Sequence, residues 1–228
     1  MKNVSRETIN TMPETSFIST FQKELEILGI PYSDTQIEQV HQHFRKLTAY
    51  NKIVNLTSID QSDQAAILLF ADSLIPLDFI HQKENARILE LGSGGGFPSI
   101  PLKIFLPDSF SFTLVERREK AAFFLEALVG YLNLKNISIQ NSRIEELFSD
   151  LSFTHAFDFV LNKAAFQTKN FLDISFGFLK PGAFALHWTK QTNITPDIPD
   201  NWNLSEIIKP PEKSSLNSNA VAVYQKTS

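Results

Sequence analysis

The strongest structural signal in this chain is the segment Arg87-Ile88-Leu89-Glu90-Leu91-Gly92-Ser93-Gly94-Gly95-Gly96-Phe97-Pro98. A short apolar run, predicted to be a strand over 87–91, passes through an acidic residue into three glycines at alternate positions, and a helix is predicted to begin at Pro98. Glycine lets the backbone turn tightly and brings its N–H groups close to a ligand, and the positive end of the helix points at the same place. The segment therefore predicts a nucleotide-cofactor loop, with a plain turn as the alternative.

The spacing of the glycines indicates which cofactor the loop binds. A dinucleotide fingerprint needs its third glycine three residues after the second, and that position is Phe97 in this chain. The sequence instead places Glu90 two residues before Gly92 and continues with Gly94 and Gly96. This pattern is typical of S-adenosylmethionine-dependent methyltransferases. We therefore expect S-adenosylmethionine as the cofactor, bound by these residues.

A second acidic residue follows the next predicted strand. Residues 110–115 alternate aromatic and β-branched side chains, as a strand does, and Glu116 comes directly after them. An ionised carboxylate at this position can accept hydrogen bonds from both hydroxyls of a ribose, as it does in Rossmann folds. We predict that Glu116 binds the ribose of the cofactor. The alternative is an acidic residue that only stabilises the N-terminus of the following helix.

The rest of the chain predicts an alternation of helices and strands. Amphipathic helices are expected at 17–28 and 33–50, followed by a connector and a third helix within 57–77. Strands are then expected at 87–91, 110–115, 137–141, 157–161 and 183–188, helices at 98–106, 117–132 and 165–178, and two last strands at 202–208 and 220–224. Such alternation implies a parallel sheet covered on both faces, and the last two strands imply a hairpin.

These elements together predict the fold class. We expect an α/β, Rossmann-like class I methyltransferase fold, with a mostly parallel seven-stranded sheet and an antiparallel C-terminal hairpin. An N-terminal helical extension is expected at 1–80 and the S-adenosylmethionine-dependent methyltransferase domain at 81–228. The glycine loop then lies at the carboxyl end of the first strand, where open α/β sheets bind ligands.

Composition excludes several classes of protein. The chain has 228 residues, 43% of them hydrophobic, which is enough for a large core. It has no cysteine, and its five histidines show no paired ligand spacing, so no metal is expected. No signal pattern opens the chain, and Asp72 and Asp78 interrupt the longest apolar region, 65–80, so we expect a cytoplasmic protein without a membrane segment. With a net charge of −4, any contact with RNA needs a local basic surface.

Several motifs together resemble one family over nearly the whole chain. They are Tyr50-Asn51-Lys52, Asn55-Leu56-Thr57, Asp72-Ser73-Leu74, Gly92-Ser93-Gly94-Gly95-Gly96-Phe97-Pro98-Ser99-Ile100-Pro101-Leu102, Phe112-Thr113-Leu114-Val115-Glu116 with Lys120 and Phe124-Leu125, and Ser142-Arg143-Ile144-Glu145-Glu146. This set is similar to the bacterial 16S ribosomal RNA guanine-N7 methyltransferases, the RsmG or GidB family. The phrase Gly-Phe-Pro-x-Ile-Pro-Leu after the glycines is far more specific than the glycines alone.

The resemblance implies an activity and roles for individual residues. It implies methylation of N7 of a guanine in 16S rRNA, with the rRNA or the small ribosomal subunit as the partner of a protein that we expect to be a monomer. Gly92 and Phe97 would line the cofactor, and Glu116 would take the ribose. Ile144 and Glu145 would border the adenine.

The sequence departs from the family pattern at several positions, including the lysine usual near the end of the fifth strand, which is displaced into His187-Trp188-Thr189-Lys190. Leu68-Leu69 stand where the family usually has Arg-His. Asn162-Lys163-Ala164 stand where it has an Arg-Ala pair after the fourth strand, and Ser99 replaces a usual glycine. Lysine replaces arginine as a charge but not as a planar two-pronged donor, so Lys163 would hold a phosphate or carboxylate less selectively.

The predicted reaction requires no proton transfer by a side chain. Guanine N7 has an exposed lone pair and loses no proton when it is methylated, so no general base is required, and catalysis comes mostly from alignment. We predict that Asn162 and Lys163, at the carboxyl end of the fourth strand, face the methyl donor and act in catalysis, with Lys163 also at the cofactor. The alternative for Lys163 is a surface lysine at a strand end.

Two groups of residues have an alternative interpretation: the basic residues expected to surround the pocket, which we call the basic rim, and the predicted helix start at Ser142. The residues that would contact rRNA phosphates are Arg117, Arg118, Lys120, Lys135 and Lys190, although a solvated helix face explains the first three equally well. Ser142 and Glu145 also fit a helix N-cap with its capping-box acid.

The chain could also be a methyltransferase of the same fold acting on another RNA or a small molecule, or a cofactor-binding homologue that has lost activity.

Overall fold

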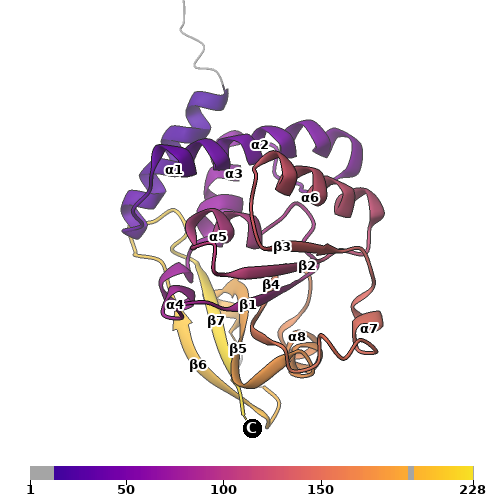
Figure 1. The fold of residues 1–228 in the computed structure, drawn as a ribbon. Helices are drawn as coiled ribbons and strands as arrows, with labels where there is room; N and C mark the ends of the chain where they lie inside the picture. Colours follow the sequence, from indigo (N-terminus) through magenta and orange to yellow (C-terminus); the bar gives the residue numbers. More distant parts are fainter. Residues whose placement is uncertain (1–12, 195–197, 228) are drawn as a thin grey trace, which may run out of the picture.

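The computed structural model describes residues 13–194 and 198–227, which form a seven-stranded sheet with helices on both faces (Figure 1). The helices are α1 (Pro13–Leu28), α2 (Asp34–Val54), α3 (Ser62–Ala65), the π-helix η1 (Ala66–Ala71), α4 (Leu77–His81), α5 (Ser99–Phe105), α6 (Glu119–Tyr131), α7 (Ile144–Leu147), α8 (Thr168–Phe176) and the 3₁₀-helix η2 (Gln191–Asn193). The strands are β1 (Arg87–Leu91), β2 (Ser111–Val115), β3 (Ile137–Gln140), β4 (Phe157–Lys163), β5 (Leu179–Lys190), β6 (Trp202–Ile208) and β7 (Asn219–Lys226).

The strand order confirms the predicted fold class. The order is β3-β2-β1-β4-β5-β7-β6, with parallel pairs from β3 to β5. Strand β7 is antiparallel to both of its neighbours, β5 and β6. The sheet is therefore mostly parallel and ends in an antiparallel C-terminal hairpin.

Each face of the sheet has its own apolar core, because successive residues of a strand point to opposite faces. In β1, Ile88 belongs to the core that includes residues of α1, α2, α5 and α6, whereas Leu89 belongs to the core of α7 and α8. Figure 1 shows the same division, with α1, α2, α5 and α6 on one side of the sheet and α7 and α8 on the other. Because helices cover both faces of the sheet, side chains on both faces of β1 are buried. Its sequence is therefore an apolar run rather than an alternation of apolar and polar residues.

The two N-terminal helices form as predicted. The Ser33 hydroxyl accepts the backbone N–H of Gln36, and the Gln36 side chain accepts the backbone N–H of Ser33, so α2 begins with a capping box. Farther along α2, the Gln39 side chain donates to the carbonyl of Leu132 at the end of α6 (3.2 Å). The side chain of Gln36 also donates to the carbonyl of Ile104 in α5 (3.2 Å). Helix α2 is thus hydrogen-bonded to α5 and to the end of α6 on its face of the sheet.

An aromatic cluster connects these helices to the glycine loop. We define it as Phe17, His43, Phe44, Phe70 and Phe97. Phe17 stacks on Phe44 with ring centroids 4.1 Å apart, and Phe70 meets Phe17 edge-on at 5.1 Å. His43 stacks on Phe97 at 4.8 Å, and Phe70 meets Phe97 edge-on at 4.9 Å. One apolar core contains residues from before and after residue 80. The predicted boundary between an N-terminal extension and the methyltransferase domain at this residue stays a prediction.

The predicted connector and third helix within 57–77 are present, but most of the helix is a π-helix rather than a regular α-helix. The described residues form a four-residue α-helix, α3, that continues into the π-helix η1, and the short α4 begins at the end of the predicted range. All six residues of η1, 66–71, are apolar, so no polar face reveals the wider helical turn in the sequence. Single π-turns inside helices often accompany functional sites.

Strand β5 is longer than the predicted 183–188. Its N-terminal end pairs Leu179 with Phe157 of β4, and its C-terminal end pairs Lys190 with Asn219 of β7. The sequence hides this extension because the strand contains Pro181-Gly182, and Gly182 has a φ of +73°. Proline and glycine are ordinarily turn residues and appear inside strands mainly at irregularities.

Candidate active site

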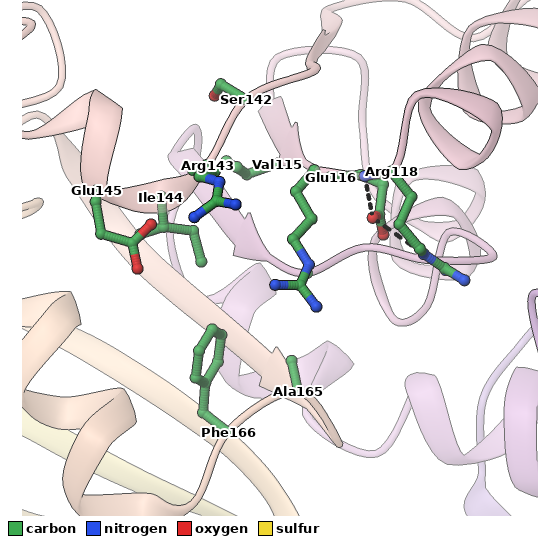
Figure 2. A pocket seen from close by; sticks show the side chains of 11 residues that line it. Val115, Glu116, Arg118, Ser142, Arg143, Ile144, Glu145, Ala165 and Phe166 are labelled. Carbon is green, nitrogen blue, oxygen red and sulfur yellow. Dashed lines mark hydrogen bonds and ion pairs between the residues drawn. The ribbon is translucent and has the colours of Figure 1, made fainter.

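Two adjoining cavities lie at the carboxyl ends of β1, β2 and β4. The first has a volume of about 340 Å³ and is lined by Gly92, Val115, Glu116, Arg117, Arg118, Ser142, Arg143, Ile144, Glu145, Ala165 and Phe166 (Figure 2). The second, of about 480 Å³, is lined by Leu56, Thr57, Ser58, Ile59, Leu68, Leu69, Gly92, Ser93, Gly94, Gly95, Phe97, Glu116, Arg118, Lys163, Ala164 and Ala165. They share Gly92, Glu116, Arg118 and Ala165. This edge of the sheet is the one at which open α/β folds bind ligands.

The backbone of the loop requires glycine at each of the three alternate positions. Gly92, Gly94 and Gly96 have φ values of +80°, +52° and +91°, which side chains other than glycine rarely adopt. A Cβ atom on Gly92 would lie 2.9 Å from the Cβ of Ala165, and one on Gly96 would lie 2.7 Å from Cγ1 of Ile100. The loop therefore makes a close passage between β1, α5 and the segment after β4.

Glu116 holds the glycine loop with its carboxylate. One oxygen accepts the backbone N–H of Gly94 (2.9 Å), and the other accepts the backbone N–H of Arg118 (2.8 Å) and its Nε–H (3.3 Å). Figure 2 shows the Arg118 side chain turned toward this carboxylate. Helix α6 begins only at Glu119, so Glu116 lies outside the first helical turn. Each carboxylate oxygen can accept more than one hydrogen bond, so the group still has acceptor capacity toward the cavities.

Apolar side chains face each other across the first cavity. Ile144, the first residue of α7, lies on one side, and Phe166, in the loop after β4, lies on the other (Figure 2). Glu145 lies next to Ile144 at the same cavity. Two apolar surfaces facing each other at a pocket suit a flat aromatic ligand group.

The prediction that Ser142 and Glu145 form a capping box is wrong. The N-cap residue of α7 is Arg143, and its backbone N–H donates to the Glu146 side chain (3.3 Å). Only the acidic half of a capping box is therefore present, and it is shifted by one residue. The hydroxyl of Ser142 is buried and has no hydrogen-bond partner among the described residues.

Lys163, at the end of β4, lines the second cavity and pairs with a buried carboxylate. Its ammonium donates to the carbonyl of Leu68 in η1 (2.8 Å) and to the carboxylate of Asp72. The side chains of Lys163 and Asp72 are 11% and 7% exposed, so Lys163 is not an exposed strand-end lysine. The π-helical turns of η1 bring this carbonyl and Asp72 to the same ammonium group.

Asn162 is fully buried and braces the loop that follows β4. Its side-chain oxygen accepts the backbone N–H groups of Ala165 (3.0 Å) and Phe166 (3.2 Å). Its side-chain N–H₂ donates to the carbonyl of Phe166 (3.0 Å) and to Nδ1 of His187 (2.8 Å). Burial lowers the pKa of His187 to about 4, so the ring is neutral at neutral pH, and the tautomer with its proton on Nε2 leaves Nδ1 to accept this N–H. The Asn162 amide thus lies behind the cavities and shapes their wall.

Glu90 is buried beneath the glycine loop. Neither cavity is lined by it, and burial raises the pKa of its carboxyl group to about 8. The hydroxyls of Ser93 and Ser99 face this carboxyl and oppose the rise, although no bond between these groups reaches ordinary hydrogen-bond geometry. Ser93 lines the second cavity, so it stands between Glu90 and that cavity.

His43 is a site residue that the sequence did not indicate. It lies on α2, is fully buried, and its Nε2 donates to the carbonyl of Gly95 (2.8 Å) while its ring stacks on Phe97. Burial lowers the pKa of His43 to about 4, so the ring is neutral at physiological pH. A histidine on an apolar helix face reads as core, and only the fold reveals its bond to the loop.

The predicted basic rim is only partly assembled at the cavities. Arg117 and Arg118 line the first cavity, and Lys120 is exposed on α6. Lys135 donates to a neighbouring asparagine, Lys190 donates to a serine and an asparagine near the start of β7, and neither lysine lines these cavities. Within residues 13–194 and 198–227, no group of acidic and histidine side chains could hold a metal, and no helix is long and apolar enough to cross a membrane.

The cavities fit S-adenosylmethionine. Their volumes lie within the range of small-molecule sites. The backbone at Gly92 leaves room that a Cβ atom would take, Glu116 retains acceptor capacity for hydroxyl groups, and Ile144 and Phe166 provide apolar surfaces for an adenine. These features are independent of one another and agree on the same ligand.

Comparison with known proteins agrees with this site. Residues 36–194 match the family model of rRNA small subunit methyltransferase G. A ribosomal RNA small subunit methyltransferase G from Lachnoclostridium phytofermentans is 32% identical over 180 residues, which cover 79% of this chain and 74% of the relative. The protein of the same description from Leuconostoc citreum is 32% identical over 171 residues, covering 74% of this chain and 71% of the relative.

Solved structures share the fold at low sequence identity. A Klebsiella pneumoniae protein assigned as an O-methyltransferase matches with a TM-score of 0.59 and 12% identity, covering 94% of this chain and 99% of that one. The Escherichia coli protein YhhF, assigned as a methyltransferase, matches with a TM-score of 0.55 and 16% identity, covering 68% and 85%. With the family match extending over both cavities, the chain belongs to the rRNA small subunit methyltransferase G family and is an S-adenosylmethionine-dependent methyltransferase.

Proposed function

We propose that this chain methylates N7 of a guanine in 16S rRNA, in the free RNA or in the small ribosomal subunit, and that it acts as a monomer. The observation that carries the proposal is the pair of adjoining cavities. They join a pocket suited to an adenosyl group to a second space bounded by the glycine loop and by Lys163. The substrate class comes from the relatives, which are described as methyltransferases of small-subunit rRNA.

The adenosyl end of the cofactor is assigned to the first cavity. Ile144 and Phe166 would cover the two faces of the adenine, and Glu145 would lie at its edge. Glu116 would accept the ribose hydroxyls with the acceptor capacity that its bonds to Gly94 and Arg118 leave. The carboxylate would then tie the ribose to the glycine loop.

The methionine end is assigned to the second cavity. Gly92, Gly94 and Phe97 line this cavity, and Gly96 lies in the same loop but faces Ile100 of α5. Glu90 lies behind the loop, so we propose that it acts on the cofactor through Ser93 rather than by direct contact.

The chain's own residues align the reactants rather than move protons. When bound, S-adenosylmethionine supplies an electrophilic methyl group. The guanine N7 lone pair needs no general base, so alignment is the main source of rate, and effective molarities of oriented groups reach about 10⁵ M or more. Asn162 would fix the loop after β4, and Lys163 would present an N–H donor to the base or a phosphate.

One observation favours a second candidate, a methyltransferase of the same fold with another substrate. Leu68 and Leu69 line the second cavity at the positions where the family resemblance leads one to expect basic residues. An apolar wall there would suit a less charged substrate than rRNA.

Methyl transfer to defined substrates tests the proposal. Small subunits and naked 16S rRNA, both from cells lacking the gene, are incubated with the protein, and modified guanines are mapped by mass spectrometry. We expect one guanine to gain a methyl group at N7. Lys163→Ala should lower the rate by about one order of magnitude or more, on the scale of a lost transition-state contact, whereas Lys163→Arg keeps a cation beside Asp72 and should retain activity.

Controls separate the possible failures. Lys169→Ala removes an exposed lysine on α8 and should leave the rate unchanged. Equal rates for wild type and Lys163→Ala would remove Lys163 from the reaction. Normal cofactor binding without transfer to any ribosomal substrate would favour the second candidate.

A further inference from the structure

Asp72 lies behind the wall of the second cavity, on the chain just after η1, and is 5% exposed. One carboxylate oxygen accepts from Lys163, and the other accepts from the side chain of Asn219 (2.7 Å). Its backbone carbonyl accepts Nε1–H of Trp188 in β5 (2.8 Å). These contacts come from β4, β5 and β7, so the carboxylate is fixed in position.

The contacts also fix Lys163. Its ammonium has three N–H donors, of which the Leu68 carbonyl and the Asp72 carboxylate take two. The remaining donor is available to the cavity that Lys163 lines.

The charges around the second cavity form two pairs. Among its lining residues, Glu116 is compensated by Arg118, with Nε and the carboxylate oxygen 3.3 Å apart. Lys163 is compensated by Asp72. Glu90 also interacts with Lys163, but its raised pKa of about 8 leaves it mostly protonated at neutral pH. Asp72 is therefore the anion that balances Lys163.

This balance bears on the ligand because the methyl donor and its product differ in charge. S-adenosylmethionine carries a positively charged sulfonium, whereas S-adenosylhomocysteine carries a neutral thioether. An uncompensated ammonium on the cavity wall would repel the first ligand and not the second, and such repulsion between nearby charges is substantial at the effective dielectric constant of a protein pocket.

We propose that Asp72 is a positioning residue that holds Lys163 in the cavity wall and offsets its charge, so that the site accepts a cationic methyl donor beside a lysine. The inference rests on the proposed function in one respect, the assignment of the methionine end of the cofactor to the second cavity.

Calorimetry with two ligands tests the proposal. S-adenosylmethionine and S-adenosylhomocysteine are titrated into wild type and Asp72→Asn, and the ratio of the two dissociation constants is compared. We expect Asp72→Asn to lower the preference for S-adenosylmethionine on the order of tenfold. The matched control is Asp158→Asn, which breaks an ion pair with Lys180 (2.9 Å) near the opposite end of β4 and should leave the ratio unchanged.

Two further variants separate charge from structure. Lys163→Met removes the cation and should shift the ratio toward S-adenosylmethionine, and adding Lys163→Met to Asp72→Asn should restore the wild-type ratio. A parallel loss of affinity for both ligands in Asp72→Asn would overturn the proposal, because it would show a purely structural role. If Asp72→Asn does not fold, Lys163→Met alone decides, and a ratio that stays constant or falls would refute the inference.

This test is independent of the RNA substrate. Wild type that binds both ligands without methylating ribosomal RNA would contradict the proposed function, and the ratio would still report on Asp72. Normal methylation by the wild type, together with a ratio that is unchanged in both Asp72→Asn and Lys163→Met, would contradict only the role of Asp72.

Discussion

Replacing Glu116 by glutamine perturbs the cofactor site while keeping the shape of the side chain. The carboxylate receives three N–H groups, one from Gly94 on one oxygen and two from Arg118 on the other. A glutamine has one oxygen and one N–H₂ group. The glutamine keeps the most hydrogen bonds when its oxygen accepts the two N–H groups of Arg118. Its N–H₂ group then faces the N–H of Gly94, and two donors form no hydrogen bond with each other.

The expected magnitude follows from these contacts. The variant loses the bond from Gly94, which exists before the cofactor binds, so only part of the about 1.5–3 kcal/mol that a hydrogen bond to a charged acceptor contributes is lost from the cofactor affinity. It also offers the ribose hydroxyls a neutral acceptor in place of an anion. Because the loop bond and the ribose bond share one group, we expect a total loss of cofactor affinity of about 1–3 kcal/mol, or roughly 5- to 150-fold.

Isothermal titration with S-adenosylmethionine measures this loss. Turnover at saturating cofactor should change less than affinity, because the ribose is remote from the transferred methyl group. Glu119→Gln, at an exposed position in the first turn of α6, should change affinity little. An affinity of Glu116→Gln within twofold of wild type would refute the assignment, and a collapse of the saturated rate alone would place Glu116 at the reaction.

Three further predictions concern stability. Because burial raises the pKa of Glu90 from 4.5 to about 8, the folded state binds a proton that the unfolded state releases, and the free energy of unfolding should fall as pH rises through this window; Glu90→Gln should remove that fall in urea unfolding curves. Burial lowers the pKa of His43 from 6.5 to about 4, so stability should decline as pH falls through that window, and His43→Phe, which can keep the aromatic stacking, should flatten the decline measured by thermal unfolding. Gly96→Ala combines a φ of +91° with a Cβ 2.7 Å from Ile100 and should cost about 1–3 kcal/mol in denaturant unfolding.

The sequence predicted those features that depend on local pattern. Residues 87–91 and 202–208 form strands with the predicted bounds, because the residues of each strand and the turn signals around it are recognisable locally. The glycine spacing likewise predicted a loop with positive φ values. By contrast, the hydrogen bond between His43 and the Gly95 carbonyl, which joins α2 to the loop, was not predicted. A hydrophobic pattern predicts that a residue is buried, but it does not predict its hydrogen-bond partner.

The pairing of Lys163 with Asp72 was hidden for a related reason. Asp72 reads in the sequence as an interruption of an apolar region, and its role depends on the wide turns of η1 and on strands β4 and β7. Asn162 was correctly placed at the end of β4, but its amide is consumed by backbone groups of the following loop. Position along a strand predicts which edge a residue occupies, not the direction of its hydrogen bonds.

The aromatic cluster has a consequence for how long the protein survives in a cell. Phe97 of the glycine loop packs on His43 and Phe70, and Phe70 in turn contacts Phe17 of α1. A ligand that binds only the native loop adds about 2.7 kcal/mol to the free energy of unfolding at a concentration of 100 Kd. Contiguous packing extends this protection to α1 and α2, so digestion by a protease within these helices should slow when methyl donor is abundant and quicken when it is depleted. Abundance of the enzyme would then follow the supply of its own substrate.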